Sequence, residues 1–463
     1  MPKNSLTLKH YKVYRAFNTA GCKGGEMLKK LPVVTFLLML TLPLFAGEAH
    51  QVTLSNGMVV ILKENHSTPM VASIVCVRAG SEFEDSTNNG FTHFLEHLLF
   101  NGTEHLSRIE LNEGFKDHGG YINAFTQKDL TGYLFVIPSI YAEYALKTQA
   151  DQLFNSTLPE SEFPKERKIV IEEIKMNYDN PDNQADMFFD SLAYQGTPYA
   201  KTVLGPINVI ETIPREAVLN YYHERYKPNN MIALFIGDFD SQDFIKLIDK
   251  YYGVEKPGEL PVVRKFTANP PYSKEIHYRD YQAKVTRMHF VFPAPSYNEP
   301  GYYAMDVLAQ ILDSGESSPL YQALTSGDDP LVNEMSVYLE SNANFSLLHF
   351  TASTDDSSKV QQVLLMTERY LGSVKDVPFE KEKLKRIEIK NKTDQIYLEE
   401  KLHYFGIMEA PMLVNFGYGF IRDYVKNLGQ VQPSDIQKVA ANYLGSGKYL
   451  AMAAIPAKAE EEQ

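Results

Sequence analysis

Cysteine and tryptophan are scarce in this sequence: its 463 residues include two cysteines and no tryptophan. Cys22 falls in an N-terminal segment that we expect to be removed, so Cys76 has no partner for an intramolecular disulfide. Cys76 stands within an apolar run, and we interpret it as a small buried core residue. The stability of the fold must therefore come from core packing.

Basic residues are outnumbered by acidic ones. The chain has 45 Lys and Arg against 58 Asp and Glu, which gives a formal net charge of −13. This balance argues against nucleic acid as a partner, because phosphate binding needs a basic surface. A content of 44% hydrophobic and 22% charged residues is typical of a globular protein. A chain of this length is expected to form two or more domains.

Long hydrophobic runs are also missing, with one exception near the N-terminus. Lys29 and Lys30 precede an apolar stretch that ends in small residues, the order typical of a secretory signal. The stretch is too short and too interrupted by proline to predict a membrane span. We expect residues 27–47 to be a signal peptide and residues 1–26 an upstream extension. The mature protein is then periplasmic or secreted, with no membrane span.

The rest of the chain repeats one order of elements. Asn56 and Gly57 between two apolar runs predict a hairpin. A predicted strand at 70–80 then precedes a helical pattern that starts at residue 90. In the second half, a predicted strand at 283–295 again precedes a helical pattern at 298–314. The sequence therefore predicts two copies of one α+β unit.

Residues 93–97, His-Phe-Leu-Glu-His, carry the strongest chemical pattern. On a helix, His93 and His97 project from one face about one turn apart. Two imidazoles at this spacing can bind one zinc ion, and Glu96 between them can accept a proton from water and return it. The alternative interpretation is an amphipathic core helix that happens to contain His and Glu.

A catalytic zinc also needs a third protein ligand. A later predicted helix, residues 165–179, offers Glu166, Glu172 and Glu173. Glu166 and Glu173 are seven residues apart and share a helix face, whereas Glu172 points elsewhere.

The inverted motif, together with this later helix, resembles the inverzincin metallopeptidases of the pitrilysin and insulinase family. The chain is most similar to the short, two-repeat members, which include mitochondrial processing peptidase subunits and bacterial periplasmic relatives. The resemblance covers residues 50–456. It implies Glu173 as the third ligand, Glu166 as a residue that supports the site, Glu96 as the catalytic residue and one Zn2+ per chain.

The resemblance also implies a fold. We expect an α+β protein of two homologous α/β rolls, each a mostly antiparallel sheet with helices packed on one face, which together form a clam-like half chamber. The predicted parts are an N-terminal zinc-binding repeat at 48–255, a linker at 256–273 and a C-terminal repeat at 274–463 without the zinc motif. Residues 1–47, the extension and signal peptide, stand outside the fold.

Residues 119–138 are similar to a family strand with the pattern Gly-Gly-x-x-Asn-Ala-x-Thr. In the family this strand lies at a sheet edge, where a peptide can dock as an added strand. Asn123 and Ala124 are the implied substrate contacts. The alternative is an ordinary hairpin strand after a Gly-Gly turn. His105 and His118 do not fit the helical ligand spacing, and we interpret both as surface or loop residues.

The second half departs from the family pattern. Self-sufficient members carry an arginine and a nearby tyrosine that donate to the developing oxyanion. Thr325 stands where the arginine is expected, and no Lys or Arg occurs from Met288 to Ser358. Tyr338 could supply the tyrosine.

We therefore expect a zinc-dependent endopeptidase for peptides or small unfolded polypeptides. A homologous chain would supply Arg and Tyr in a heterodimer, which we favour over a homodimer. The alternatives are a non-catalytic assembly protein that retains the fold, and a metal-binding module without hydrolysis.

Overall fold

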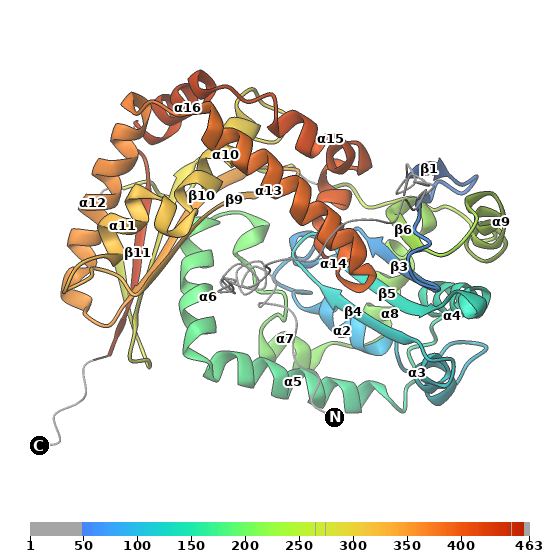
Figure 1. Ribbon diagram of the computed structural model, residues 1–463. Helices are drawn as coiled ribbons and strands as arrows, with labels where there is room; N and C mark the ends of the chain where they lie inside the picture. The colour runs from blue at the N-terminus through green and yellow to red at the C-terminus, as the bar shows by residue number, and fades with distance from the viewer. Residues whose placement is uncertain (1–48, 264, 274, 446, 458–463) are drawn as a thin grey trace, which may run out of the picture.

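The computed structural model describes residues 49–457 apart from residues 264, 274 and 446 (Figure 1). The predicted extension and signal peptide lie outside the described residues. None of the helices in the described part is both long enough and apolar enough to span a bilayer. The chain forms two sheets with helices packed around them.

The first sheet is built from the first half of the chain, and its strand order is β1-β2-β6-β3-β5-β4. Only β2 and β6 pair in parallel, and the other neighbours are antiparallel. The predicted Asn56–Gly57 hairpin is confirmed: it joins β1 to β2, and Gly57 has a φ of 85° that favours glycine. The strands are β1 (His50–Thr53), β2 (Val59–Glu64), β3 (Met70–Val77), β4 (Tyr121–Thr126), β5 (Thr131–Pro138) and β6 (Met231–Gly237).

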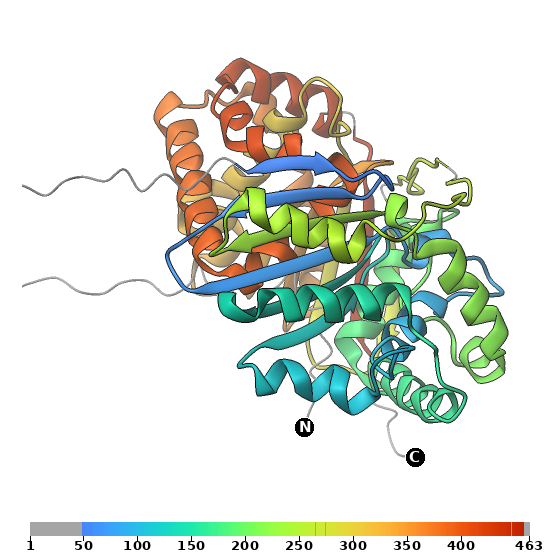
Figure 2. The ribbon, with the colours of Figure 1, turned by 90° about the vertical axis from the view of Figure 1, so that its right-hand side faces the viewer.

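Helices of the first half cover one face of this sheet and enclose the first core. Figure 2 shows α4 and α9 lying along the strands. Alternate strand residues such as Val60, Val75 and Phe235 point into this core. The helices are α2 (Phe91–Leu98), α3 (Arg108–Asp117), α4 (Ala142–Phe154), α5 (Phe163–Asp179), α7 (Ile207–Thr212), α8 (Arg215–Arg225) and α9 (Ser241–Tyr252).

The second sheet comes from the second half, and its strand order is β7-β11-β8-β10-β9. Only β7 and β11 pair in parallel. A second core separates this sheet from its helices. The strands are β7 (Ile276–Tyr281), β8 (Thr286–Pro293), β9 (Glu334–Ser341), β10 (Ser346–Thr354) and β11 (Leu450–Pro456). The helices are α10 (Tyr302–Leu312), α11 (Pro319–Thr325), α12 (Val360–Ser373), α13 (Lys381–Glu400), α15 (Tyr418–Leu428) and α16 (Pro433–Val439).

The two sheets share one topology once β1 is set aside. The order β2-β6-β3-β5-β4 corresponds to β7-β11-β8-β10-β9, with the same parallel and antiparallel pairs. The helices that follow β3 and β8 also start alike, because Gly90 and Gly301 both cap them with φ near 97° and 98°. The predicted α+β fold of two homologous, mostly antiparallel units is confirmed. The predicted boundaries at 48–255, 256–273 and 274–463 stay a prediction.

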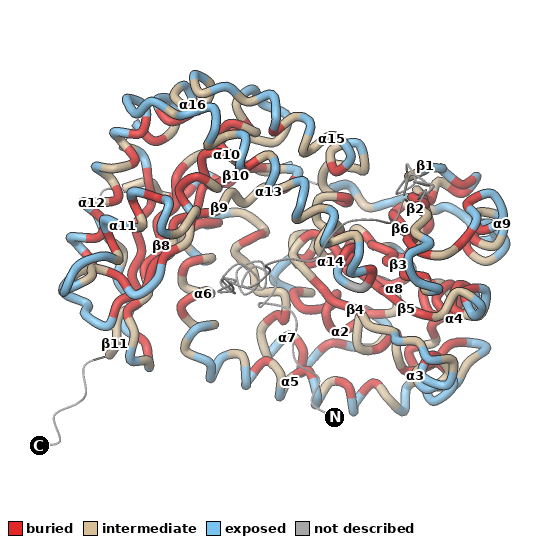
Figure 3. The backbone as a smooth tube through the Cα atoms, viewed as in Figure 1, coloured by how far each residue is buried: buried red, intermediate tan, exposed pale blue. Residues whose placement is uncertain are grey.

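One helix from each half crosses to the sheet of the other half. The helix α6 (Pro181–Ala193) packs on the second sheet, and α14 (Leu402–Phe416) packs on the first (Figure 1). The expectation that helices pack on one face of each sheet is therefore incomplete. Figure 3 shows the buried residues concentrated along the strands, between these layers.

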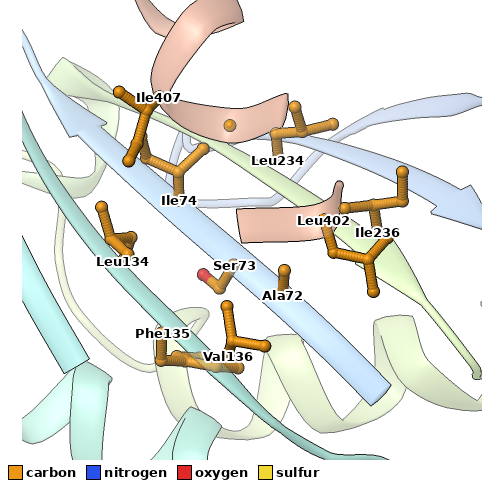
Figure 4. A pocket seen from close by; sticks show the side chains of 11 residues that line it. Ala72, Ser73, Ile74, Leu134, Phe135, Val136, Leu234, Ile236, Leu402 and Ile407 are labelled. Carbon is orange, nitrogen blue, oxygen red and sulfur yellow. The ribbon is translucent and has the colours of Figure 1, made fainter. Parts of the chain in front are cut away.

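The contact between α14 and the first sheet is close. A Cβ on Gly406 would lie 2.8 Å from Cγ2 of Ile74, so the absence of a side chain lets the helix approach β3. A cavity of about 10 Å3 remains beside this contact (Figure 4). Its labelled lining is mostly apolar and comprises Ala72, Ser73, Ile74, Leu134, Phe135, Val136, Leu234, Ile236, Leu402 and Ile407.

Candidate metal centre

The helix α2 carries the two histidines, and a buried carboxylate fixes its first turn. Glu84 accepts hydrogen bonds from the backbone N–H groups of Gly90 (2.8 Å) and Thr92 (2.7 Å). A negative charge at this end of the helix also complements the helix dipole. Burial raises the pKa of Glu84, and the hydrogen bonds from Thr92 and Asn89 act against that rise. The start of α2 is thus set by contacts outside the helix.

His93 and His97 lie together on the inner face of α2, as the helical spacing predicts. Their ring centroids are 4.9 Å apart. The side chain of His93 is 3% exposed and that of His97 is 11% exposed. Both imidazoles are therefore largely shielded from water. Two buried polar rings side by side are unusual in a plain core helix, so this observation favours a metal site over that alternative.

Glu173 on α5 reaches the same point in space. Its Oε2 atom lies 3.8 Å from Nε2 of His93 and 3.5 Å from Nε2 of His97. Both distances are too long for good hydrogen bonds. Two ligands about 2.0 to 2.1 Å from one tetrahedral zinc ion are about 3.4 Å apart, so the observed spacing fits three ligands of one metal. Among the described residues, His93, His97 and Glu173 form the one such group, with ligand atoms within 4.8 Å of one another.

Glu166 contacts one of the three proposed ligands, His97, on the side of its ring away from Glu173. Its Oε2 lies 3.4 Å from Nδ1 of His97, and its Oε1 lies 3.6 Å from Nη2 of Arg108. A carboxylate behind a metal-binding imidazole fixes the orientation of the ring. Burial acts to raise the pKa of Glu166, but the contacts with His97 and Arg108 lower it overall. Glu172 instead pairs with Lys175 on the exposed side of α5, as its helical position predicts.

Charge is distributed unevenly between the two imidazoles. Burial, followed by the nearby His97, lowers the pKa of His93 to about 3. Burial also acts to lower the pKa of His97, but contacts with Glu166 and Glu173 and the charge of Glu96 raise it to about 9. At neutral pH His93 is neutral and His97 carries a proton. A metal ligand must be deprotonated, so metal binding would release that proton.

Glu96 points from α2 toward the end of β4. The hydroxyl of Thr126, the last residue of β4, donates to its Oε2 at 2.6 Å. Sequence reasoning did not single out Thr126, although it is the threonine of the Gly-Gly-x-x-Asn-Ala-x-Thr pattern. The sequence pattern contains Thr126, but its contact with Glu96 depends on how β4 crosses α2, which the pattern does not specify.

The predicted substrate contacts lie on an edge strand. β4 ends the first sheet and pairs only with β5 among the described strands. Asn123 is half-buried, and the side chain of Ala124 packs into the first core. The role of Asn123 and Ala124 in binding a peptide stays a prediction.

His105, His118 and Cys76 are not part of this group, as expected. His105 is exposed and its Nδ1 lies 2.7 Å from Asp151. His118 directly follows α3, and its Nδ1 lies 2.6 Å from the carbonyl oxygen of Gly114. Cys76 is fully buried in β3, where burial raises the pKa of its thiol.

The second half has no copy of this centre on its matching helix. Counting from the capping glycines Gly90 and Gly301, the positions of His93, Glu96 and His97 correspond to Ala304, Val307 and Leu308. All three side chains are buried in the second core. The two copies of the fold have thus diverged at the chemically important positions.

Thr325 and Tyr338 take ordinary structural positions. The hydroxyl of Thr325 donates to the carbonyl oxygen of Tyr321 at 2.8 Å near the end of α11. Tyr338 lies on β9 and stacks on His349, with ring centroids 4.9 Å apart. Thr325 therefore cannot replace the missing cation.

Comparison with known proteins gives the class to which this fold and site belong. The insulinase family (peptidase family M16) matches residues 59–207, and the peptidase M16 inactive domain matches residues 212–390. The chain belongs to peptidase family M16. The expected resemblance is confirmed, and the label of the second match agrees with the apolar residues on α10.

Several relatives are similar over much of their length. A probable mitochondrial-processing peptidase subunit beta of Schizosaccharomyces pombe is 30% identical over 335 residues, 70% of each chain. An uncharacterized zinc protease, YmxG, of Bacillus subtilis is 29% identical over 70% of this chain and 78% of its own. The zinc protease PqqE of Helicobacter pylori is 26% identical over 94% of this chain and 97% of its own.

Solved structures share the fold. A protease from Helicobacter pylori superposes with a TM-score of 0.79 at 24% identity and covers 89% of this chain and 100% of its own. A putative M16-like peptidase from Alicyclobacillus acidocaldarius gives a TM-score of 0.75 at 20% identity, over 89% of this chain and 98% of its own.

Proposed function

We propose that this chain is a zinc-dependent endopeptidase. The observation that carries the proposal is the convergence of His93, His97 and Glu173 from two helices at distances that suit one tetrahedral ion. Two nitrogen donors and one carboxylate oxygen form a donor set that suits zinc, and three protein ligands leave a fourth position open. The zinc proteases among the relatives support the same chemistry.

In this proposal the residues of the site have separate roles. When bound, zinc polarises a carbonyl oxygen and lowers the pKa of a coordinated water. Glu96 accepts a proton from water at the site and returns it to the leaving amine. Glu166 holds the ring of His97 in place through Nδ1. The three proposed ligands hold the metal, and none of them accepts or returns the proton itself.

The substrate in this proposal is an extended peptide. The outer side of β4 is open among the described strands, so a peptide can add there as a further strand. Asn123 and Ala124 on β4 would contact it. The backbone of such a peptide would run close to Glu96, because Thr126 at the end of β4 contacts that carboxylate.

We further infer that a homologous chain completes the site. The stretch from Met288 to Ser358 contains no Lys or Arg, and Thr325 is engaged by its own helix. Donors for the developing oxyanion must then come from elsewhere. Relatives named as subunits beta of mitochondrial-processing peptidase support a paired chain.

We also propose that the mature protein is periplasmic or secreted, because residues 27–47 have the order of a secretory signal.

The test combines metal analysis with peptide cleavage. We expect wild-type protein to bind one zinc ion per chain, and H97A and E173Q to lose it. E96Q should keep zinc and lose cleavage, because it lacks the base but no proposed ligand. H105A is the matched control, since His105 is exposed and is not part of the ligand group, and it should keep both zinc and cleavage.

Two other outcomes would overturn the proposal. Wild-type protein without bound metal would indicate an assembly protein that retains the fold. Bound zinc with no cleavage in the presence of its partner chain would indicate a metal-binding module.

A further inference from the structure

The last residue of β4 is buried against the metal helix. Thr126 is 1% exposed, and it pairs with Thr131 at the start of β5. Its hydroxyl lies 2.6 Å from Oε2 of Glu96. The threonine hydroxyl is the donor and the carboxylate oxygen is the acceptor.

The hydroxyl of Thr131 is engaged separately. It donates to the carbonyl oxygen of Ala79 at 3.0 Å and lies 3.5 Å from the hydroxyl of Thr126. A hydroxyl has one proton to donate, and Thr131 donates it to the carbonyl oxygen of Ala79. Of these two threonine hydroxyls, that of Thr126 is the one that donates to Glu96.

Hydrogen bonds from several other elements hold the turn after Thr126. The ammonium group of Lys128 donates to Asp190 at 2.6 Å and to the carbonyl oxygen of Tyr199 at 2.7 Å. Asp129 accepts from the side-chain amide of Asn415 on α14. The backbone N–H of Glu82 donates to the carbonyl oxygen of Lys128 at 2.7 Å. These contacts tie the turn after β4 to α6, to α14 and to the segment that follows β3.

We propose that Thr126 is a positioning residue for Glu96. Its hydroxyl holds one carboxylate oxygen, and this limits rotation of the carboxylate about its terminal bond, so that the group stays aimed at the site bounded by His93, His97 and Glu173. The proposal rests on the proposed function, since Glu96 needs an orientation only if it transfers a proton. Correct aim of a catalytic group contributes strongly to rate.

The kinetic test uses matched variants of the hairpin. T126V keeps the shape of the side chain and removes the donor, T126S keeps the donor, and T131V removes a buried hydroxyl that does not hold Glu96. We expect T126V to lower kcat by about 10- to 100-fold with little change in KM or zinc content. T126S should restore most of the loss, whereas T131V should lower the melting temperature without a comparable loss of kcat.

A structural test does not depend on hydrolysis. Crystals of the metal-free wild-type protein, T126V and T126S would show whether the Glu96 carboxylate keeps its orientation. We expect it to turn in T126V and to stay in place in T126S. An unchanged Glu96 in T126V, or a T126V enzyme with wild-type kcat, would overturn the proposal. If the wild-type protein cleaves no peptide, the proposed function fails, and the crystals alone decide whether Thr126 orients Glu96.

Discussion

Glu82 is a half-buried acid next to the turn that follows β4. Its Oε2 atom is buried without a hydrogen-bond partner among the described residues. Burial, and secondarily the charge of Asp129, raise the pKa of Glu82 to about 8. Its folded-state pKa thus lies above the ordinary value of 4.5. Between these two values the folded state holds a proton that the unfolded state has lost.

This pKa predicts how stability changes with pH. The contribution of Glu82 to the free energy of unfolding should fall as pH rises from about 5 to 8, because this side chain is protonated in the folded state and ionised in the unfolded state in that window. E82Q cannot ionise, so relative to the wild type it should gain about 2 to 4 kcal/mol of stability between pH 5 and pH 9. Urea unfolding at several pH values measures this. The control is E160Q at an exposed position, and equal pH profiles for E82Q and the wild type would contradict the prediction.

His97 predicts a proton release when zinc binds. With its pKa near 9 and that of His93 near 3, the metal-free site carries one imidazole proton at pH 6. Zinc binding should release about one proton there, because both imidazoles must be neutral as ligands. Calorimetry at pH 6 in buffers of different ionisation enthalpy counts the protons. Zinc binding without proton release would show that His97 is already neutral.

At the scale of elements, the sequence predicted the two helices of the metal centre well. His93 and His97 needed only the helical repeat, and the face shared by Glu166 and Glu173 followed from their spacing of seven. The helical repeat determines which side chains project from the same face of a helix. Local periodicity also sufficed to predict that the second half would repeat the strand and helix order of the first.

Contacts between elements distant in sequence were not predictable in the same way. Thr126 was overlooked because its contact with Glu96 depends on how β4 crosses α2. The crossing of α6 and α14 between sheets was also missed, since an apolar helix face does not specify which of two similar sheets it covers. Such choices are made by packing rather than by local pattern.

The close approach of α14 to β3 makes Gly406 sensitive to substitution. In G406A the new methyl group would meet Ile74 at 2.8 Å, and both residues are buried. We expect a loss of about 1 to 3 kcal/mol from overpacking. In the matched variant G372A on α12, no atom lies within 4 Å of the new Cβ, so helix propensity should stabilise it by about 0.5 to 1 kcal/mol. Equal effects of both substitutions on the melting temperature would contradict the packing argument.

At the scale of the whole molecule, the two halves share a fold but differ in chemistry. The first carries the candidate metal centre, whereas the matching helix of the second carries Ala304, Val307 and Leu308 in its core. The duplicated half thus contributes a sheet, a core and the helix α14 that packs on the first sheet. Its own contribution to catalysis would have to come from other positions.

If the chain is the proposed endopeptidase, the absence of a cation from Met288 to Ser358 predicts that its activity depends on a second chain. Purified alone, the protein should bind zinc and cleave peptides weakly. Addition of a homologous chain that carries the arginine should raise kcat by about 100-fold, a typical contribution of one oxyanion donor. Titration of the partner at fixed protein measures this. Full activity of the isolated chain would rule out the need for a partner.

The central claim is that His93, His97 and Glu173 bind one zinc ion, and anomalous diffraction at the zinc absorption edge tests it most directly. Crystals of the zinc-loaded protein should give one strong peak within about 2.0 to 2.2 Å of a donor atom from each of the three side chains. Zinc-saturated crystals with no peak at this position, or with a peak that Glu173 does not reach, would contradict the claim.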